Sequence, residues 1–293
     1  MQKQFLTLTI GLVLAIGGSP LHAQPHERTV RDTVSVGDGP VSIDNREGSI
    51  TVSTWGRDEV AYRARIVSEQ VEEAVQQTRV DIDRSGGGLS LTTNYDDVEG
   101  QWTFGPRAFG YVKTDPPVHY TIRMPESVAL QVDDHESDID VSGLSDAVRI
   151  DTHEGDTRIT DHSGRAEVSS HEGQTVLREM TGNLIVETHE GAVTVDGLSG
   201  RLDLETHDGR ADVRIDALKE IVADTHEGVV TLSVPASSGF DLSTDLGNEA
   251  TLEESIDLSS ARRGENDYRG SVRGGGPLLR LTSHEGRITL RSQ

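Results

Sequence analysis

The sequence predicts an all-β protein whose main body is a β-solenoid, a β-helix-like rod of 18-residue coils with two strands each. The first observation is a glycine at every ninth position through successive repeats. The second is an alternation of apolar and polar side chains after each glycine, which is typical of a strand with one buried face. The third is composition, because 31 glycines and only 4% aromatic residues favour many short strands and turns. The glycines in register are Gly155, Gly164, Gly173, Gly182, Gly191, Gly200 and Gly209, and Gly228 resumes the spacing after one inserted residue near Leu218.

The third and fifth residues of each repeat are predicted to face the interior. Leu184 and Val186 are one such pair, and Leu202 and Leu204 are another. A glycine at one fixed place suits a turn with positive φ or a close approach of two backbones. Repeats that end in His followed by Glu or Asp alternate with repeats that do not. The true period is therefore 18 residues, and successive coils are expected to stack about 4.8 Å apart.

The solenoid is predicted to span residues 128–293, with an irregular insertion at about 236–276. The insertion is inferred because the repeat returns at Pro277 and runs through His284 and Glu285 into Gly286. A matching unit runs from Gly39 to Trp55, close to the N-terminus. The chain is expected to end in a strand of the rod.

Residues 1–23 read as a signal peptide. Lys3 precedes an apolar run from Phe5 to Gly17, and Ala23 is the small residue that a signal peptidase needs. The run is shorter than the roughly 20 residues that span a bilayer, so no transmembrane segment is expected in the mature chain. The protein is predicted to be exported to the bacterial periplasm or the extracellular space.

Residues 24–127 are predicted to form a β-rich region with one short helix. A strand is expected at 60–67, a helix capped by Ser68, and a hairpin of strands 79–83 and 89–93 around three glycines. Residues 95–117 read as a long aromatic loop. This region would cover the open sheet edge at one end of the rod, or its loop would bind a ligand. The aromatic residues of the loop are Trp102, Phe104, Phe109 and Tyr111.

Charge and cysteine content exclude several classes of function. With 27 basic and 50 acidic side chains, the net charge is −23. Nucleic-acid binders need basic patches, and anionic lipid surfaces attract basic segments, so neither partner is expected. The chain has no cysteine, which excludes disulfides and thiolate chemistry.

Three phrases of the sequence resemble a known family. They are the segment from Val41 to Val60, the repeated Glu-Gly pairs, and the closing segment from Gly274 to Gly286. Together they resemble the bacterial putative-adhesin family of β-strand repeat proteins, domain of unknown function 4097, over about residues 30–293. The resemblance implies a β-solenoid in an envelope or extracellular protein, and it brings no catalytic residues. The His-Glu pair at the corner departs from the commoner pattern of that family.

The histidines before these carboxylates are candidate metal ligands. Coil stacking places six in one column, and imidazole and carboxylate groups suit Zn²⁺, Cu²⁺ or Ni²⁺. The alternative is a polar residue tolerated at an exposed corner and repeated by duplication. Five arginines, Arg158, Arg165, Arg201, Arg210 and Arg214, are expected to offset the repulsion between stacked carboxylates. The candidate ligands are His135, His153, His171, His189, His207 and His226 with Glu154, Glu172, Glu190, Asp208 and Glu227.

No pattern in the sequence favours catalysis. There is no Gly-x-Ser-x-Gly, phosphate loop or His-Glu-x-x-His motif. The nonapeptide of calcium β-rolls is also absent. We therefore expect a non-catalytic scaffold or binding module with an adhesin-like or envelope role, whose partner is an envelope or extracellular protein or a glycan. The alternatives are a divalent-metal binder using the His/Glu column and, less favoured, a carbohydrate-active β-helix enzyme. No cofactor other than such a metal is expected.

Overall fold

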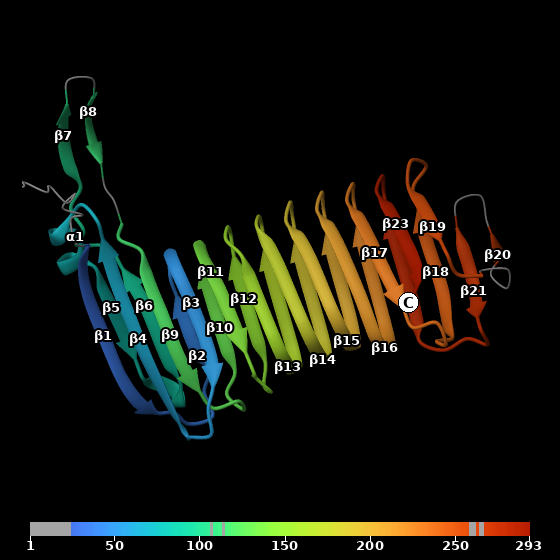
Figure 1. The fold of residues 1–293 in the computed structure, drawn as a ribbon, viewed down its shortest axis with the longest axis horizontal. Coiled ribbons are helices and arrows are strands. Elements are labelled where there is room, and N and C mark those ends of the chain that lie inside the picture. The colour runs from blue at the N-terminus through green and yellow to red at the C-terminus, as the bar shows by residue number, and fades with distance from the viewer. Residues whose placement is uncertain (1–24, 106–107, 113–114, 258–261, 264–266) are drawn as a thin grey trace, which may run out of the picture.

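The computed structural model describes residues 25–105, 108–112, 115–257, 262–263 and 267–293. The signal peptide predicted at residues 1–23 lies outside these residues. The described chain is all-β, and its strands lie side by side along one long axis (Figure 1). The prediction of an all-β protein is confirmed.

The central strands pair in parallel with the strands 18 residues further along the chain. Thr157 lies opposite Thr175, which is followed in the next pairing by Val193, so each 18-residue repeat adds one rung to a stack. Four long strands bend and contribute to both sides of the stack. The central strands are β10 (Leu130–Asp134), β11 (Glu136–Ser142), β12 (Val148–Thr152), β13 (Thr157–Ser170), β14 (Gln174–Thr188), β15 (Ala192–Thr206), β16 (Arg210–Thr225) and β17 (Val229–Val234).

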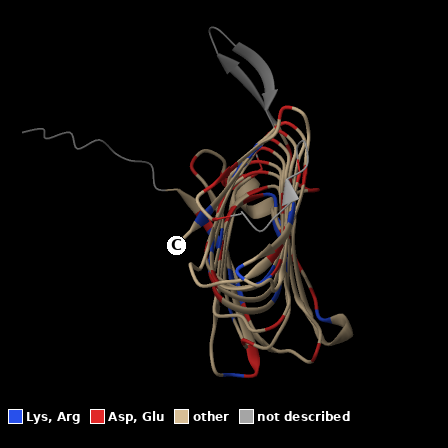
Figure 2. Cartoon of the chain, turned by 90° about the vertical axis from the view of Figure 1, so that its right-hand side faces the viewer, with Lys and Arg blue, Asp and Glu red and all other residues tan. Residues whose placement is uncertain are grey.

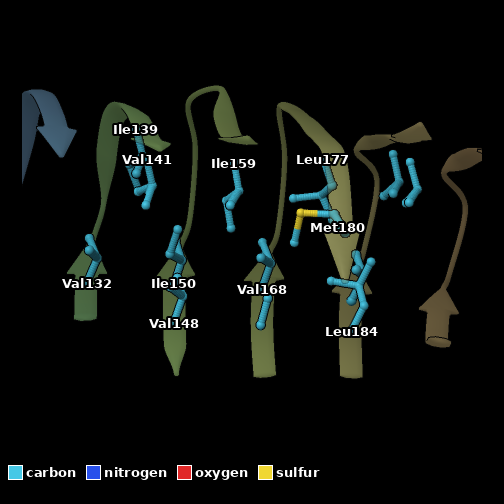
Figure 3. Packing of buried hydrophobic residues seen from close by; sticks show 14 of the residues in the cluster. Val132, Ile139, Val141, Val148, Ile150, Ile159, Val168, Leu177, Met180 and Leu184 are labelled. Atoms are coloured by element: carbon cyan, nitrogen blue, oxygen red, sulfur yellow. The ribbon is translucent and has the colours of Figure 1, made fainter. Parts of the chain in front are cut away.

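Each rung presents two short apolar stretches to the interior of the stack. Figure 3 shows Val132, Ile150 and Val168 on one set of strands facing Ile139 and Ile159 on the other. The predicted inward pairs are buried, because Leu184, Val186, Leu202 and Leu204 are all 2% exposed or less. Burying a Val, Leu or Ile side chain contributes about 1.5–3 kcal/mol, so these columns hold neighbouring rungs together.

The repeat glycines share a close approach to the preceding rung, and only the earlier ones also have positive φ. φ is positive at Gly155, Gly164, Gly173 and Gly182, whereas it is not at the later repeat glycines from Gly191 onward. In both groups a Cβ would meet the backbone of the preceding rung, and at Gly191 it would lie 2.6 Å from the carbonyl oxygen of Gly173. Both roles that the sequence suggested for glycine therefore occur, and they coincide in the earlier repeats.

The N-terminal unit joins the same stack. Strands β2 and β3 pair in parallel with β10 and β11, and on their other side with β6 and β9. Antiparallel strands β1, β4 and β5 then close this end. These strands are β1 (His26–Ser35), β2 (Val41–Asp44), β3 (Glu47–Thr54), β4 (Glu59–Ser68), β5 (Arg79–Asp83), β6 (Leu89–Asn94) and β9 (Val118–Met124).

The predicted strand, helix and hairpin of this region are all present, with one change at the helix start. Helix α1 (Glu72–Gln77) buries Ala74 and Val75. Ser68 Oγ accepts hydrogen bonds from the N–H groups of Gln70 and Val71, which precede the helix. Ser68 therefore orders the approach to α1, whose N-cap position is Val71. Among the described residues, no helix is long and apolar enough to cross a bilayer.

The segment predicted as an aromatic loop contains two strands. Strands β7 (Gln101–Gly105) and β8 (Ala108–Val112) form an antiparallel hairpin that projects from the N-terminal end of the stack (Figure 1). Trp102 pairs with Tyr111, and Phe104 with Phe109. The prediction of a loop was wrong here, because residues 101–105 and 108–112 pair as strands.

The C-terminal rungs are not stacked in chain order. Strands β22 and β23 pair with β16 and β17 on one side and with β18 and β19 on the other. The irregular insertion predicted at 236–276 thus supplies the next rung of the stack, which lies against the rung formed by β22 and β23. Antiparallel β21 covers β18, and β20 pairs with β21. These strands are β18 (Phe240–Leu246), β19 (Thr251–Glu254), β20 (Arg262–Arg263), β21 (Tyr268–Val272), β22 (Leu278–Ser283) and β23 (Arg287–Ser292).

Candidate functional site

One corner of the stack carries a histidine in rung after rung. Each histidine follows a strand whose last residue, such as Thr152 or Thr206, is buried. Side chains alternate along a strand, so the next residue emerges at the surface. Backbone bonds then fix the corners to one another: the N–H of His171 donates to the oxygen of Thr152 at 3.2 Å, and the N–H of Glu172 to that of His153 at 2.9 Å. The corner is held in register by backbone as well as by packing.

The imidazole rings form a continuous pile, which we call the imidazole ladder. Five successive contacts are stacked, with centroids 4.6–5.0 Å apart and interplanar angles of 6–13°. His284 adds a seventh ring at 4.9 Å, tilted by 35°. The sequence places His284 at an equivalent corner, but we expected only six rings in the column, because the chain returns to the stack only after the insertion. The ladder comprises His135, His153, His171, His189, His207, His226 and His284.

Five of the rings have a carboxylate close to the Nδ1 atom, supplied by the next residue in the chain. The distance is 3.5 Å for His135 and Glu136, 3.8 Å for His153 and Glu154, and 2.8 Å for His207 and Asp208. These histidines are about half exposed, with side-chain accessibilities of 52%, 49% and 47%. The carboxylates therefore face the ring edges and leave the groups open to solvent. The same relation joins His171 to Glu172 and His226 to Glu227.

A shallow groove of about 600 Å³ runs along the ladder. On the strand side it is bordered by a second set of acidic side chains, two residues before four of the histidines. Burial and the neighbouring Asp245 raise the pKa of one of these, Asp224, and His226 opposes that effect. Figure 2, which looks along the stack, shows Asp and Glu recurring in successive turns. The second acidic set is Asp151, Glu187, Glu205 and Asp224.

Four of the five arginines expected to offset the corner carboxylates contact other acids. Arg165 pairs with Glu167 at 3.0 Å, Arg201 with Glu220 at 3.8 Å, and Arg210 with Asp212 at 2.8 Å. Arg214 bridges Asp196 and Asp216. No ion pair joins these arginines to the carboxylates beside the ladder within the described ranges. That part of the prediction was wrong, because the arginines lie on other faces of the rungs.

One part of the ladder brings three potential metal ligands together. Ligand atoms of His207, Asp208 and His226 lie within 4.8 Å of one another, and all three residues are exposed. A transition-metal ion binds imidazole nitrogen at roughly 2.0–2.1 Å. The side chains would have to converge further, which exposed rotamers allow. In the part of the chain that the structure describes, the other predicted ligands also place a carboxylate after each histidine, but no other three of them form so close a group.

A buried polar cluster closes the N-terminal end of the ladder. In the next rung Arg46 takes the place of histidine and pairs with Asp115 at 2.8 Å. Beneath it, the Asn45 side-chain amide donates to Ser137 Oγ at 2.9 Å, and its oxygen accepts from Thr93 at 2.8 Å. Asp134 accepts from the Ser137 N–H at 2.6 Å, and burial raises its pKa. The sequence reasoning missed this cluster, although polar residues before each corner histidine were a signal for it.

Comparisons with known proteins concern the fold only. No protein-family model matches the chain, and no curated protein matches it. A crystal structure described as a putative lipid binding protein from Parabacteroides distasonis covers 89% of this chain and 96% of its own at 8% identity, with a TM-score of 0.50. A putative adhesin from Bacteroides fragilis covers 91% and 97% at 13% identity, with a TM-score of 0.47. A putative adhesin from Parabacteroides distasonis covers the same shares at 9% identity and a TM-score of 0.47.

Proposed function

We propose that this chain is an exported, non-catalytic β-solenoid scaffold that binds a partner along the imidazole ladder. The observation that carries the proposal is the pile of seven rings, 4.6–5.0 Å apart, five of which line one groove. A surface repeated at a constant interval suits an extended ligand that makes the same contact several times. Repeated weak contacts on one rigid body add up to avidity without any single tight site.

The parallel pairing with an 18-residue offset supports the solenoid reading, since each rung contacts its neighbours alone. The segment at residues 1–23 supports export. The resemblance to the putative-adhesin family supports a place in the cell envelope or outside it. The partner is accordingly a protein or glycan of that compartment.

Repetition also argues against catalysis. A catalytic centre needs groups of different character converging on one reacting atom. The ladder offers the same imidazole and carboxylate in rung after rung, and the groups along it differ little in burial. Such a surface favours binding over bond making or breaking.

The test compares three forms of the mature chain, each immobilised and exposed to solubilised envelope material. They are the wild type, a ladder variant with His171→Ala, His189→Ala and His207→Ala, and a matched variant in another exposed column. Residues Arg165, Asn183 and Arg201 occupy successive rungs away from the groove, so their alanine variant is the control. A component retained by wild type and control but lost from the ladder variant supports the proposal. Identical retention by all three would overturn it.

A second candidate function is divalent-metal binding, favoured by the proximity of His207, Asp208 and His226. The open geometry supports several weak sites and no closed tetrahedral cage. We expect Zn²⁺, Cu²⁺ or Ni²⁺ to bind in calorimetry and to raise the melting temperature of the wild type. Binding should weaken below about pH 6 as imidazoles protonate. Equal heats from the wild type and the ladder variant would exclude this function.

A further inference from the structure

A second groove, of about 500 Å³, lies on the outer face of the N-terminal strands, apart from the imidazole ladder. Its floor is formed by small residues on three adjacent strands: Thr33 on β1, Ala61 on β4 and Thr121 on β9. Around this floor stand three arginines, Arg31, Arg63 and Arg123, and Trp55. We call this site the arginine groove.

Two of these arginines lie close enough for their like charges to repel each other. Arg31 and Arg63 lie directly opposite each other in the antiparallel pair of β1 and β4. Like charges in that relation destabilise a sheet. Glu27 forms an ion pair with Arg63 at 3.8 Å, which reduces this repulsion in part. The same carboxylate also contacts Arg65 at 3.5 Å. Packing alone does not require such a pair at an exposed position.

Few carboxylates are available to neutralise the groove. Asp32 lines it, but that carboxylate is held by Arg84 at 2.7 Å and accepts the Thr33 N–H at 2.8 Å. Arg31 and Arg123 have no ion pair among the residues that the structure describes. Two guanidinium groups, each with a planar fork of donors, are thus free for an anionic ligand.

Trp55 adds an aromatic surface to the rim of the groove. Its indole N–H donates to the backbone oxygen of Glu59 at 2.7 Å. The backbone N–H of Trp55 donates to the backbone oxygen of Met124 at 3.0 Å. The side chain of Arg57 lies over the ring at 4.9 Å. The ring is therefore fixed in place while remaining partly exposed. A rigid, half-exposed indole beside guanidinium groups combines an apolar face with anion recognition.

The surrounding charge permits an anion to approach this end of the molecule. Residues 25–125 carry 11 basic and 16 acidic side chains, whereas the whole chain has a net charge of −23. Most of the excess negative charge thus lies further along the stack. At physiological salt it is screened over about 8 Å. A long polyanion lying along the rod would be repelled, but a short acidic group entering the groove would not.

We propose that the arginine groove binds an acidic saccharide, with its carboxylate or sulfate between Arg31 and Arg123 and its ring against Trp55. The groove volume of about 500 Å³ suits one or two sugar rings. The two anionic groups share the same chemistry, namely oxygens that accept paired N–H donors from guanidinium. This site is independent of the imidazole ladder, so either proposal can stand without the other.

The test uses Trp55 as its own reporter. The chain has two tryptophans, so Trp102→Phe leaves Trp55 as the only one. In that background, fluorescence titrations are run with oligogalacturonate, which carries carboxylates, and with a sulfated dextran oligomer. Neutral dextran and a single-stranded DNA oligonucleotide are the comparison ligands. The groove variant is Arg31→Gln with Arg123→Gln. The matched control is Arg158→Gln with Arg178→Gln, which makes the same charge change on exposed residues further along the stack.

We expect saturable binding of at least one acidic saccharide, weakened tenfold or more in the groove variant and unchanged in the control. Binding should fall as salt is raised from 50 to 300 mM. The melting temperature of the groove variant should equal or exceed that of the parent, because a like-charge pair is removed. Equal affinity in the two variants, no binding by the parent, or equal binding of neutral dextran or DNA would each overturn the assignment. The response to the two acidic ligands tells carboxylate from sulfate.

Discussion

At the scale of single residues, the close approach of neighbouring rungs depends on the repeat glycines. A Cβ at Gly191 would lie 2.6 Å from the Gly173 oxygen and 2.8 Å from Thr188 Oγ1. Real contacts are not that short, so the two rungs would have to separate. The next residue, Ala192, is exposed and has room for a larger side chain.

We therefore predict that Gly191→Val lowers the free energy of unfolding by about 2–4 kcal/mol, because a core-like overlap is among the few causes of so large a loss. Ala192→Val should change it by no more than about 0.5 kcal/mol. Urea unfolding of both variants measures the difference. Equal stability of the two would mean that the stack tolerates a side chain at the glycine position.

A second residue-scale feature is His162, which lies inside the stack. It is 2% exposed, stands between Leu144 and Met180 in successive rungs, and neither ring nitrogen has a hydrogen-bond partner. Burial lowers the pKa of His162 below its ordinary value of 6.5. Below that pH the unfolded chain gains a proton that the folded chain does not accept, so His162 reduces stability progressively as the pH falls.

We predict that His162→Met stabilises the fold, by about 1–3 kcal/mol at neutral pH, because it removes unsatisfied polar atoms from an apolar column. The advantage over the wild type should grow as the pH falls from 7.5 to 5. The ladder histidines are present in both proteins, so the difference between the two isolates His162. Parallel pH profiles of stability would show that the residue remains solvated or paired in solution.

At the scale of elements, the apolar columns decide whether a rung forms. Leu204 is fully buried, between Val186 in one neighbouring rung and Ala223 in the other. An aspartate here would bury a charge without a partner. We predict that Leu204→Asp lowers the free energy of unfolding by about 3–5 kcal/mol. Asp203→Asn, an exposed change in the same strand, should be nearly neutral. Circular dichroism melts test the pair, and similar melting temperatures would contradict the assigned register.

The repeated elements were predictable because periodicity specifies both which residues face inward and where each strand turns. Leu184 and Leu202 are buried as their spacing indicated. The segments without a repeat were harder to predict. The hairpin of β7 and β8 depends on cross-strand pairing that leaves no periodic trace, and β18 lacks the repeat glycine. The ladder and the carboxylates beside it followed from the spacing of the histidines, but the acids that the arginines contact did not.

At the scale of the whole molecule, the chain order and the spatial order agree through the middle of the stack and separate at its end. Sequence periodicity reports which residues are equivalent, and it does not report which rung is adjacent to which after an interruption. The arginine groove illustrates the same limit. Arg31, Arg63 and Arg123 lie on three strands that no repeat connects, and only the antiparallel pairing of β1, β4 and β9 brings them together.

The spatial order at the C-terminal end yields the last prediction. Strands β22 and β23 lie between β16–β17 and β18–β19. The final residue is also held, since the Gln293 N–H donates to the Val234 oxygen at 2.9 Å and its side chain to the Ile215 oxygen at 2.8 Å. A chain truncated after Gly276 therefore loses an internal rung, which leaves open edges on both sides.

We expect hydrogen exchange of the truncated chain to show lost protection at residues 240–254, which lose their parallel partners, and weakened protection at 221–234. A truncation that removes Gln293 alone is the matched control and should leave both segments protected. If β22 and β23 were instead the outermost rung, residues 240–254 would keep their protection when these strands are removed. Rungs in a stack are stabilised by their nearest neighbours. The segments that lose protection in the truncated chain are therefore the ones adjacent to the removed rung.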